Sequence, residues 1–337
     1  MFFAEIKIMK TRFLPLFIFI QFILLLAGCS PVKYIETETL EPAEIAIPHK
    51  INSAVLILNK PSSSFKRIDT EDFKGYLLEE IKYGIADVLN NSPRINSNDI
   101  VVPEYEEVKH LIKKDTLTWL DMKAITDTFN VDALIYMDRF ALKSSLKDEM
   151  VVDHGNLLYK LTFTIVSNTH WRIHYPYQNL QIDDHSYSEK FVWEAYDYSK
   201  DEAIARLPEY EKTYREAAYW TGYDYGKRIF PTWKRTARSY YVSGTEEFRK
   251  ASAKVDSSKY EEAIELWKKN LNHTDAELVS RAAYNIAFAF EMLGKIDMAL
   301  KWARKSNEIK AKRRTIQYIN KLEERRKSTS RLRHQIN

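Results

Sequence analysis

The apolar positions of residues 51–199 follow two periods in turn, one typical of strands and one typical of helices. Residues 53–58 are continuously apolar, which indicates a short strand buried on both faces. Residues 74–90 carry apolar side chains at helical spacing, and Gly84 on that stripe would allow a close approach to a sheet. The pattern predicts a mixed sheet with packed helices, in the order β-α-β-α-α-β-β-β, over residues 53–58, 74–90, 94–102, 105–112, 118–130, 131–142, 159–165 and, for the last strand, 180–182 with 190–196.

One of these helices carries its own start and stop signals. Thr118 followed by Asp121 has the spacing of a capping box, which marks a helix N-terminus. Asn130 suits the C-terminal end of the same helix, because asparagine tolerates the left-handed conformation found there. We therefore expect a helix between these two residues.

From residue 200 onward the apolar period becomes helical. A helix is predicted near 209–238, and Gly222 and Gly226 form a small-xxx-small face on it. In a soluble region such a face indicates tight packing against another helix. This part of the chain is therefore expected to be a set of connecting helices.

Residues 245–311 contain two copies of a paired-helix pattern. Ala263 and Ala299 occupy equivalent places 36 residues apart, close to the tetratricopeptide period of about 34. The region resembles a tetratricopeptide pair, with Gly294 in the second turn and Ser258 replacing that glycine in the first. The resemblance implies a concave surface for a protein segment, with candidate partner-binding residues Tyr260, Trp267, Asn285, Phe288 and Trp302. The alternative is an internal brace whose groove is filled by the chain's own helices.

The first 29 residues have the pattern of a secretory signal. A positive stretch precedes an apolar run over 13–26, whose 14 residues are fewer than the roughly 20 that a membrane span needs. The run ends in a segment that resembles a bacterial lipobox, formed by Leu26, Ala27, Gly28 and Cys29. The resemblance implies that Cys29, the only cysteine, opens the mature chain and carries diacylglycerol and a fatty acyl group such as palmitate. The alternative is a plain secretory signal with a chance cysteine.

Composition and charge narrow the class of protein. Apolar residues make up 45% of the chain and aromatic residues 13%, which is typical of a packed globular protein. With Cys29 acylated, no disulfide can form within one chain. Residues 301–337 contain 13 Lys and Arg against three Glu, although the whole chain carries only +4. So basic a tail can contact anionic headgroups or can be a solvated helix face. Nucleic acid is not expected as a partner outside the cytoplasm.

Candidate chemistry is sparse. His170 and His174 lie four residues apart in a segment expected to be extended, where about 13 Å separates them and they cannot share one metal ion. Asp183, Asp184 and His185 could form an acid–base or metal patch, but a turn between strands also explains them and is the favoured interpretation. The aromatic residues that could bind a glycan, or pack in the core, are Trp171, Trp193, Tyr196, Trp220, Tyr223 and Trp233. We expect no metal and no cofactor.

The α/β part resembles a known periplasmic domain. The segments VLIL, LLEEIKYGIADVLNNSPRINSND and MKAITDTFNVDALIYMDRF are similar to a domain shared by curli-secretion lipoproteins, the TolB N-terminal domain and lipoprotein activators of peptidoglycan synthases. The resemblance covers residues 51–145 and implies a fold but no catalytic or binding residue. The long membrane-spanning hairpins of curli-type proteins are not evident, which argues against a pore. With the lipobox and the repeats, the whole chain resembles Bacteroides-type tetratricopeptide-repeat lipoproteins (DUF6340-like).

These observations predict an α+β domain followed by an all-α, tetratricopeptide-like region. The expected parts are a signal peptide (1–28), a tether (29–50), an α/β periplasmic domain (51–199), connecting helices (200–244), two repeats (245–311) and a basic C-terminal helix and tail (312–337). We expect a non-enzymatic scaffold for envelope assembly or maintenance, which recruits an envelope protein through its repeats. Ser30, without a following acidic export signal, favours the periplasmic face of the outer membrane. The alternatives are a glycan- or peptidoglycan-binding protein and a hydrolase that uses Asp183, Asp184 or His185.

Overall fold

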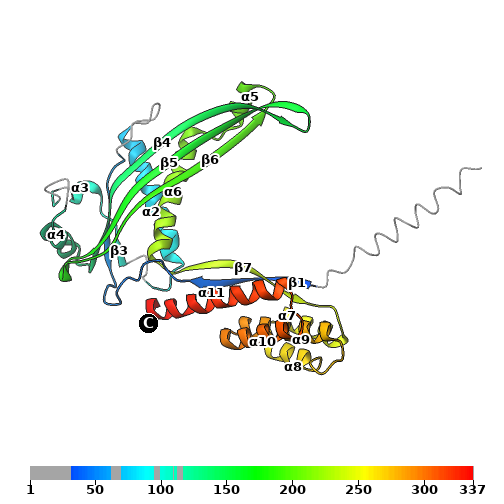
Figure 1. The fold of residues 1–337 in the computed structure, drawn as a ribbon. Coiled ribbons are helices and arrows are strands. Elements are labelled where there is room, and N and C mark those ends of the chain that lie inside the picture. The colour runs from blue at the N-terminus through cyan, green and yellow to red at the C-terminus, as the bar shows by residue number, and fades with distance from the viewer. Residues whose placement is uncertain (1–31, 62–69, 95–98, 109, 112–116, 337) are drawn as a thin grey trace, which may run out of the picture. The chain divides into compact units, whose positions relative to one another are not determined.

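The computed structural model describes residues 32–61, 70–94, 99–108, 110–111 and 117–336 (Figure 1). The chain divides into two compact units. Unit 1 contains the described residues up to Thr37 together with Arg235–Lys327, and unit 2 contains Glu38–Lys234 together with the residues from Ser328 onward. The predicted signal peptide lies outside the described residues. In the part of the chain that is described, no helix has the length and apolar character needed to cross a membrane.

Unit 2 is built on a mixed sheet of five strands in the order β3-β2-β4-β5-β6. β2 pairs in parallel with both β3 and β4, whereas β5 runs antiparallel to β4 and to β6. The predicted mixed sheet with helices is therefore confirmed. The strands are β2 (Ala54–Leu58), β3 (Ile100–Val101), β4 (Ala133–Asp153), β5 (Asn156–Tyr175) and β6 (Leu180–Asp197).

Three of these strands are longer than the sequence predicts. β4 and β5 pair from Leu134 opposite His174 to Asp153 opposite Asn156, and they form one long hairpin. Its turn places His154 and Gly155 at φ of 45° and 86°, as a two-residue hairpin turn requires. A long hairpin is thus present where none is evident from the sequence, because polar residues on both faces of its outer half hide the strand pattern.

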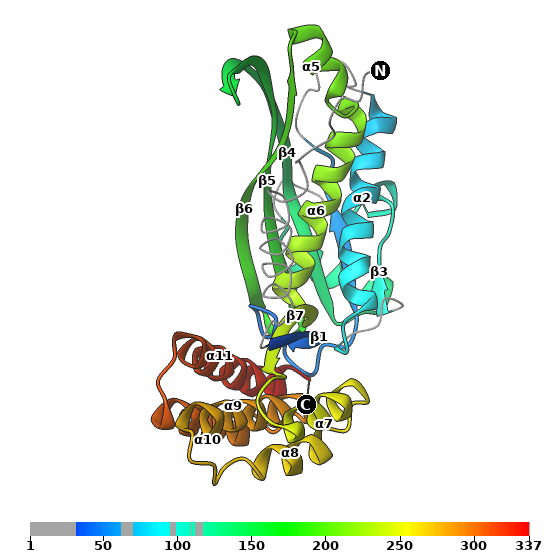
Figure 2. The same ribbon diagram turned by 90° about the vertical axis from the view of Figure 1, so that its right-hand side faces the viewer.

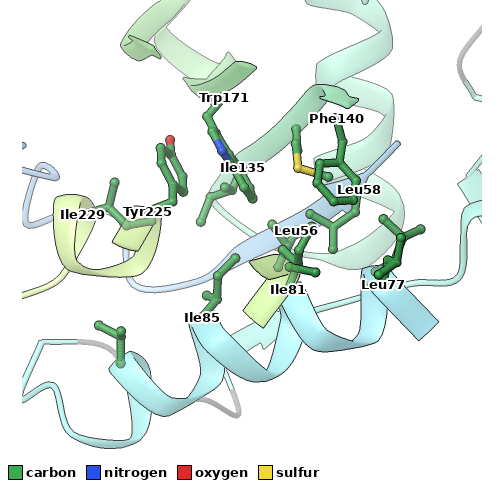
Figure 3. Close-up of a cluster of buried hydrophobic side chains, with 14 of the residues drawn as sticks. Leu56, Leu58, Leu77, Ile81, Ile85, Ile135, Phe140, Trp171, Tyr225 and Ile229 are labelled. Atoms are coloured by element: carbon green, nitrogen blue, oxygen red, sulfur yellow. The ribbon is translucent and has the colours of Figure 1, made fainter. Parts of the chain in front are cut away.

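Two helices cover one face of the sheet, as Figures 1 and 2 show. They are α2 (Glu71–Asn90) and α6 (Tyr210–Ile229), and the short α5 (Lys200–Arg206) precedes α6. Ile81 and Ile85 of α2 and Tyr225 of α6 point into the core that the sheet closes (Figure 3). There the ring of Tyr225 stacks on Trp171 of β5, with 4.1 Å between ring centroids.

The opposite face is covered at one end by α4 (Trp119–Phe129), which follows the short α3 (Tyr105–Val108). The predicted signals of α4 are confirmed. Thr118 and Asp121 form a capping box, and Asn130 ends the helix in the left-handed conformation with φ of 51°. These contacts are local in sequence, which is why sequence patterns alone predict them.

The glycines of α2 and α6 set the distance between the two helices. A Cβ on Gly84 would lie 2.1 Å from the main-chain oxygen of Tyr219, and one on Gly222 would lie 2.1 Å from that of Ile81. The prediction that Gly84 allows a close approach is therefore confirmed. The predicted neighbour is wrong, because Gly84 packs against helix α6 and not against the sheet. Gly222 and Gly226 provide the tight helix packing that their spacing predicts.

Two predicted segments are wrong. Residues 32–41 form strand β1 (Val32–Glu41) instead of a tether, and the predicted helix 209–238 ends at Ile229, after which β7 (Thr232–Tyr241) follows. β1 and β7 pair in a two-stranded sheet. Their direction is antiparallel, since Thr236 Oγ1 donates to the carbonyl of Thr37 and Thr39 Oγ1 donates to that of Lys234, each at 3.4 Å.

Unit 1 is otherwise helical, as predicted, with two successive helix pairs and a fifth helix. The helices are α7 (Glu246–Asp256), α8 (Tyr260–Lys268), α9 (Ala276–Met292), α10 (Ile296–Ile309) and α11 (Arg313–Ile336), the last of which continues into unit 2. The turns of the two pairs are alike. Ser258 and Gly294 both have positive φ, of 56° and 72°, so the serine occupies the place of the turn glycine, as the sequence predicts.

Candidate functional site

The residues predicted to bind a partner lie in unit 1, and three of them belong to its core. The exposed fraction of Trp267, Asn285 and Phe288 is 0%. Phe288 stacks on Tyr240 of β7 with 5.0 Å between ring centroids. The structure therefore corrects the prediction for these three residues, because buried side chains offer no surface to a partner.

Asn285 instead binds the chain's own main chain. Its Nδ2 donates to the carbonyl of Tyr241 at 2.7 Å, and its Oδ1 accepts from the amide of Tyr241 at 2.8 Å. Both contacts are buried, so each is worth more than it would be at a wet surface. The end of β7 thus occupies the position expected for a partner segment. These contacts favour the alternative of an internal brace, with a strand of the chain bound at Asn285.

Tyr260 and Trp302 are the two predicted residues that stay accessible. Tyr260 is half-buried and meets Phe288 edge-on, with 6.3 Å between centroids. Trp302 of α10 is also half-buried, and the ammonium of Lys305 lies 4.8 Å from the centroid of its ring. These two side chains remain the available part of the predicted partner surface.

A buried carboxylate connects three elements of unit 1. The sequence patterns above do not predict it. Glu291 of α9 has an exposed fraction of 0%. It accepts from Arg238 of β7 at 2.9 Å, from Arg325 of α11 at 2.7 Å and from the hydroxyl of Tyr318 at 2.8 Å. Burial, with the nearby charge of Glu291, raises the pKa of Tyr318 well above its usual range. This network joins three elements through one side chain.

In unit 2, a row of charged side chains lies on the sheet face opposite α2 and α6. His170 Nδ1 lies 2.6 Å from Asp138 Oδ1, and its Nε2 lies 2.8 Å from Asp184 Oδ1. Arg172, two residues further along β5, pairs with Asp138 at 2.7 Å. The hydrogen bond from His170 lowers the pKa of Asp184. Both ring nitrogens of His170 are engaged by carboxylates, and Arg172 joins the same network.

These side chains do not form a metal centre. His170 and His174 lie on one strand, four residues apart, which confirms the extended geometry that the sequence predicts. Among the residues that the structure describes, no three His, Cys, Asp or Glu side chains gather closely enough to hold a metal ion.

The predicted patch of Asp183, Asp184 and His185 does not exist as one site. The three residues lie within β6 and not in a turn, so neighbouring side chains point to opposite faces. Asp183 is buried and accepts from Arg228 Nη2 at 3.0 Å, while Asp184 belongs to the charged row. The ring of His185 meets that of Tyr187, with 4.6 Å between centroids. The favoured interpretation of a turn is therefore wrong, and so is the alternative of a shared acid–base or metal patch.

His174 is a buried polar group without a partner. Its exposed fraction is 2%, and within the described chain neither ring nitrogen has a hydrogen-bond partner. The ring of Trp119 meets it edge-on at 5.4 Å. Burial lowers the pKa of His174 to about 4, and the charge of Arg172 contributes to the shift.

This pKa predicts a loss of stability in acid. The folded pKa lies below the ordinary 6.5, so protons bind the unfolded state first as the pH falls from 6.5 to 4. Across that window we expect the wild type to lose about 3 kcal/mol more of its unfolding free energy than His174→Phe. Denaturant unfolding at several pH values measures the difference. His154→Asn, at an exposed turn, is the control and should leave the slope unchanged. Equal slopes for His174→Phe and the wild type would contradict the assignment.

The aromatic residues divide between core and surface. Trp171 has an exposed fraction of 0%, and Trp193 packs on Phe163 with 6.0 Å between centroids. Trp220 of α6 is 40% exposed and touches its neighbours Tyr219 and Tyr223 edge-on, at 5.3 and 5.2 Å. We call these three residues the α6 aromatic cluster. The other exposed predicted aromatics are Tyr196 and Trp233.

Two families match the chain. The profile described as Domain of unknown function (DUF8603) matches residues 63–241, and the profile described as Domain of unknown function (DUF6340) matches residues 249–324. The second match confirms the predicted DUF6340-like character over residues 249–324, whereas the prediction extended to the whole chain. No curated protein matches the chain.

Three of the solved structures with some similarity to the chain come from bacteria. A homolog of neuraminyllactose-binding hemagglutinin from Helicobacter pylori has a TM-score of 0.32 at 11% identity, covering 56% of this chain and 88% of its own. The PelC dodecamer, a variant from Paraburkholderia phytofirmans, has 0.21 at 7%, covering 58% and 99%. The hypothetical protein CT253 from Chlamydia trachomatis has 0.24 at 10%, covering 51% and 96%. TM-scores this low support no conclusion about fold or function, so the resemblance to the curli-secretion domain stays a prediction.

Proposed function

The chain belongs to the family described as Domain of unknown function (DUF8603), and we propose that it is a lipid-anchored protein-interaction scaffold of the cell envelope and not an enzyme. The anchor would be Cys29, at the end of the lipobox-like segment Leu26, Ala27 and Gly28. These residues lie outside the described ones. The observation that carries the proposal is the place of Cys29, three residues before the first residue of β1.

This spacing would bring the proposed anchor close to unit 1. Three extended residues span at most about 10 Å, so a lipid on Cys29 would hold the start of β1 close to the bilayer. Two or more acyl chains anchor a protein stably, whereas one does not. The position proposed for the protein is the periplasmic face of the outer membrane.

Replacement of the acylated residue tests the anchor. We expect Cys29→Ser to move the protein from the membrane fraction to the soluble fraction, because no thiol remains to carry lipid. Fractionation with immunodetection measures the shift, and mass spectrometry of the mature N-terminus should show the acyl groups in the wild type only. Ser30→Ala is the matched control, since it leaves the thiol in place. A Cys29→Ser protein that stays at the membrane would contradict a lipid anchor.

The scaffold surface would be the accessible part of the helix pairs. Tyr260 of α8 and Trp302 of α10 are half-buried aromatics, a residue type that is enriched where proteins meet. The equivalent turns at Ser258 and Gly294, 36 residues apart, support a tetratricopeptide-like reading of these pairs.

A glycan-binding role is the second candidate, and the α6 aromatic cluster favours it. Exposed aromatic faces stack on sugar rings, and the carboxylate of Asp87 lies beside the cluster, where it accepts from the hydroxyl of Tyr219. Carboxylates next to an aromatic platform could accept from sugar hydroxyls. This role needs no contact from unit 1.

One crosslinking experiment separates the two roles. A photo-crosslinking amino acid replaces Trp302 in one variant, Trp220 in a second and the exposed Lys268 in a third, which is the control. The scaffold role predicts one discrete protein adduct from position 302 and none from 268. The glycan role predicts cell-wall fragments on position 220 and no protein on 302. Adducts that are the same at 302 and 268 would contradict a specific partner surface.

A further inference from the structure

The end of unit 1 at which β1 begins carries an excess of positive charge. Because β1 and β7 are antiparallel, Val32 at the start of β1 lies at the same end of their sheet as Tyr241, the last residue of β7. Cys29 precedes Val32 by three residues, which can span at most about 10 Å. A lipid anchor at Cys29, as proposed above, would therefore hold this end of the sheet near the bilayer.

Three cationic side chains surround the ring of Tyr241. The guanidinium carbons of Arg281 and Arg314 lie 5.2 and 5.8 Å from the ring centroid, and the ammonium of Lys312 lies at 5.2 Å. They come from α9 and from the start of α11, so two separate elements supply them. The neighbouring Lys310 and Arg313 are exposed. We call Arg281, Lys310, Lys312, Arg313 and Arg314 the basic surface.

Among the described residues, the carboxylate of Glu277 pairs with three of these five side chains. Glu277 accepts from Arg281 at 2.8 Å and pairs with Lys310 at 3.2 Å and with Lys312. The hydrogen bond from Lys312, with those from Lys310 and Arg281, lowers the pKa of Glu277 to about 2. So low a pKa is what an excess of nearby positive charge produces. The N-terminus of the 24-residue helix α11, at Arg313, adds a partial positive charge.

An exposed aromatic side chain lies beside the same end. Tyr34, five residues after Cys29, has an exposed fraction of 63%. Tyrosine is enriched at the headgroup level of membranes, because its ring is apolar and its hydroxyl is polar. The acidic side chains of β1, Glu36 and Glu38, come further along the strand. An attachment point, a cationic cluster and an interfacial aromatic thus come together in one unit.

We propose that the basic surface binds the phosphate headgroups of anionic phospholipids in the membrane that carries the Cys29 anchor. The proposal rests on the proposed lipid anchor, and it adds a second, electrostatic contact to the same bilayer. A cluster of basic side chains next to an acyl anchor strengthens the attachment of a protein to a membrane with anionic lipids, and it can fix the orientation of the protein. The contact holds α9 and α11 toward the lipid.

Vesicle binding without the acyl chains tests the proposal. The probe is the chain from residue 29 onward with Cys29→Ser, mixed with vesicles of phosphatidylcholine alone or of equal parts phosphatidylcholine and phosphatidylglycerol. We expect at least about tenfold more protein to sediment with the anionic vesicles, and the excess to vanish at high salt, because exposed charges are then screened. Equal binding to both vesicles would overturn the proposal.

Charge reversal locates the contact. Lys310→Glu with Arg313→Glu changes two exposed residues of the basic surface, and we expect binding to fall by about fivefold or more. The control pair is Lys295→Glu with Lys301→Glu, which makes the same change in net charge at the N-cap and within the N-terminal half of α10. Arg313→Glu alone serves if the double variant melts at a lower temperature than the control. Equal losses from both pairs would show attraction by net charge only and would overturn the proposal.

Two further arms separate the alternatives. Inorganic phosphate at matched ionic strength should leave vesicle binding unchanged, and full competition by it would show a site for free phosphate instead of a membrane surface. Because the probe carries no lipid, a failure to find acyl groups on Cys29 in cells would contradict the anchor and leave the vesicle result standing.

Discussion

Gly222→Ala is expected to destabilise unit 2 by about 3 kcal/mol or more. The added methyl group would lie 2.1 Å from the main-chain oxygen of Ile81, and neither helix backbone can move without disturbing the core beneath it. Overpacking of this kind acts on a contact between backbones, where no side chain can rotate away. Chemical denaturation followed by circular dichroism measures the unfolding free energy.

Gly75→Ala is the matched control for this substitution. Gly75 lies within α2, and a Cβ there would have no atom within 4 Å. Since alanine favours the helix and restricts the unfolded chain, we expect this variant to be about 0.5 to 1 kcal/mol more stable. A Gly222→Ala protein within 1 kcal/mol of the wild type would show that α2 and α6 do not pack as closely as described.

Glu291→Ala should destabilise unit 1 by about 3 to 5 kcal/mol. The substitution leaves Arg238 and Arg325 partly buried without their shared carboxylate, and it removes the acceptor of the Tyr318 hydroxyl. Because α11 is joined to α9 through this side chain, we expect the amides of α11 to lose their protection from hydrogen exchange first. Hydrogen exchange of the variant and the wild type measures this loss.

Glu265→Ala provides the comparison for an exposed pair. Glu265 is 69% exposed and pairs with Lys268, and loss of such a pair typically costs less than about 1 kcal/mol. Glu291→Gln keeps the volume of the side chain and removes only its charge. If this variant loses less unfolding free energy than Glu291→Ala, the difference between the two losses is due to packing. Equal stability of Glu291→Ala and Glu265→Ala would contradict the role given to the buried network.

The sequence predicts the elements whose signals are local. The capping box of Thr118 and Asp121 and the turn residues Ser258 and Gly294 each act within a few residues, so their positions can be read from the sequence. β1 and β7 escape prediction because each strand is stabilised by the other, about 200 residues away. Their mixed polar sequence has no clear period.

The sites were harder to predict, for reasons that the fold makes clear. Asp183 and Asp184 are adjacent in sequence but face opposite sides of β6, so adjacency misleads. Arg172 could have been found, because alternation places it on the same face of β5 as His170. Asp138 could not, since a register shift in β4 between Met137 and Arg139 lies at that position. A signal for Glu291 exists, as one acidic residue within an apolar stretch of helix.

The pairing of Asn285 with Tyr241 means that any partner segment binding at Asn285 would have to compete with β7. A segment from another protein that used the same amide contacts would have to displace a strand that is covalently attached and therefore present at an effective concentration of about millimolar or more. The apparent affinity for the partner segment is the intrinsic affinity multiplied by the fraction of molecules in which β7 is detached from Asn285. Displacement of β7 costs binding free energy, so a ligand needs further contacts beyond Asn285 to bind. The strand of the chain itself therefore contributes to the selectivity for partners.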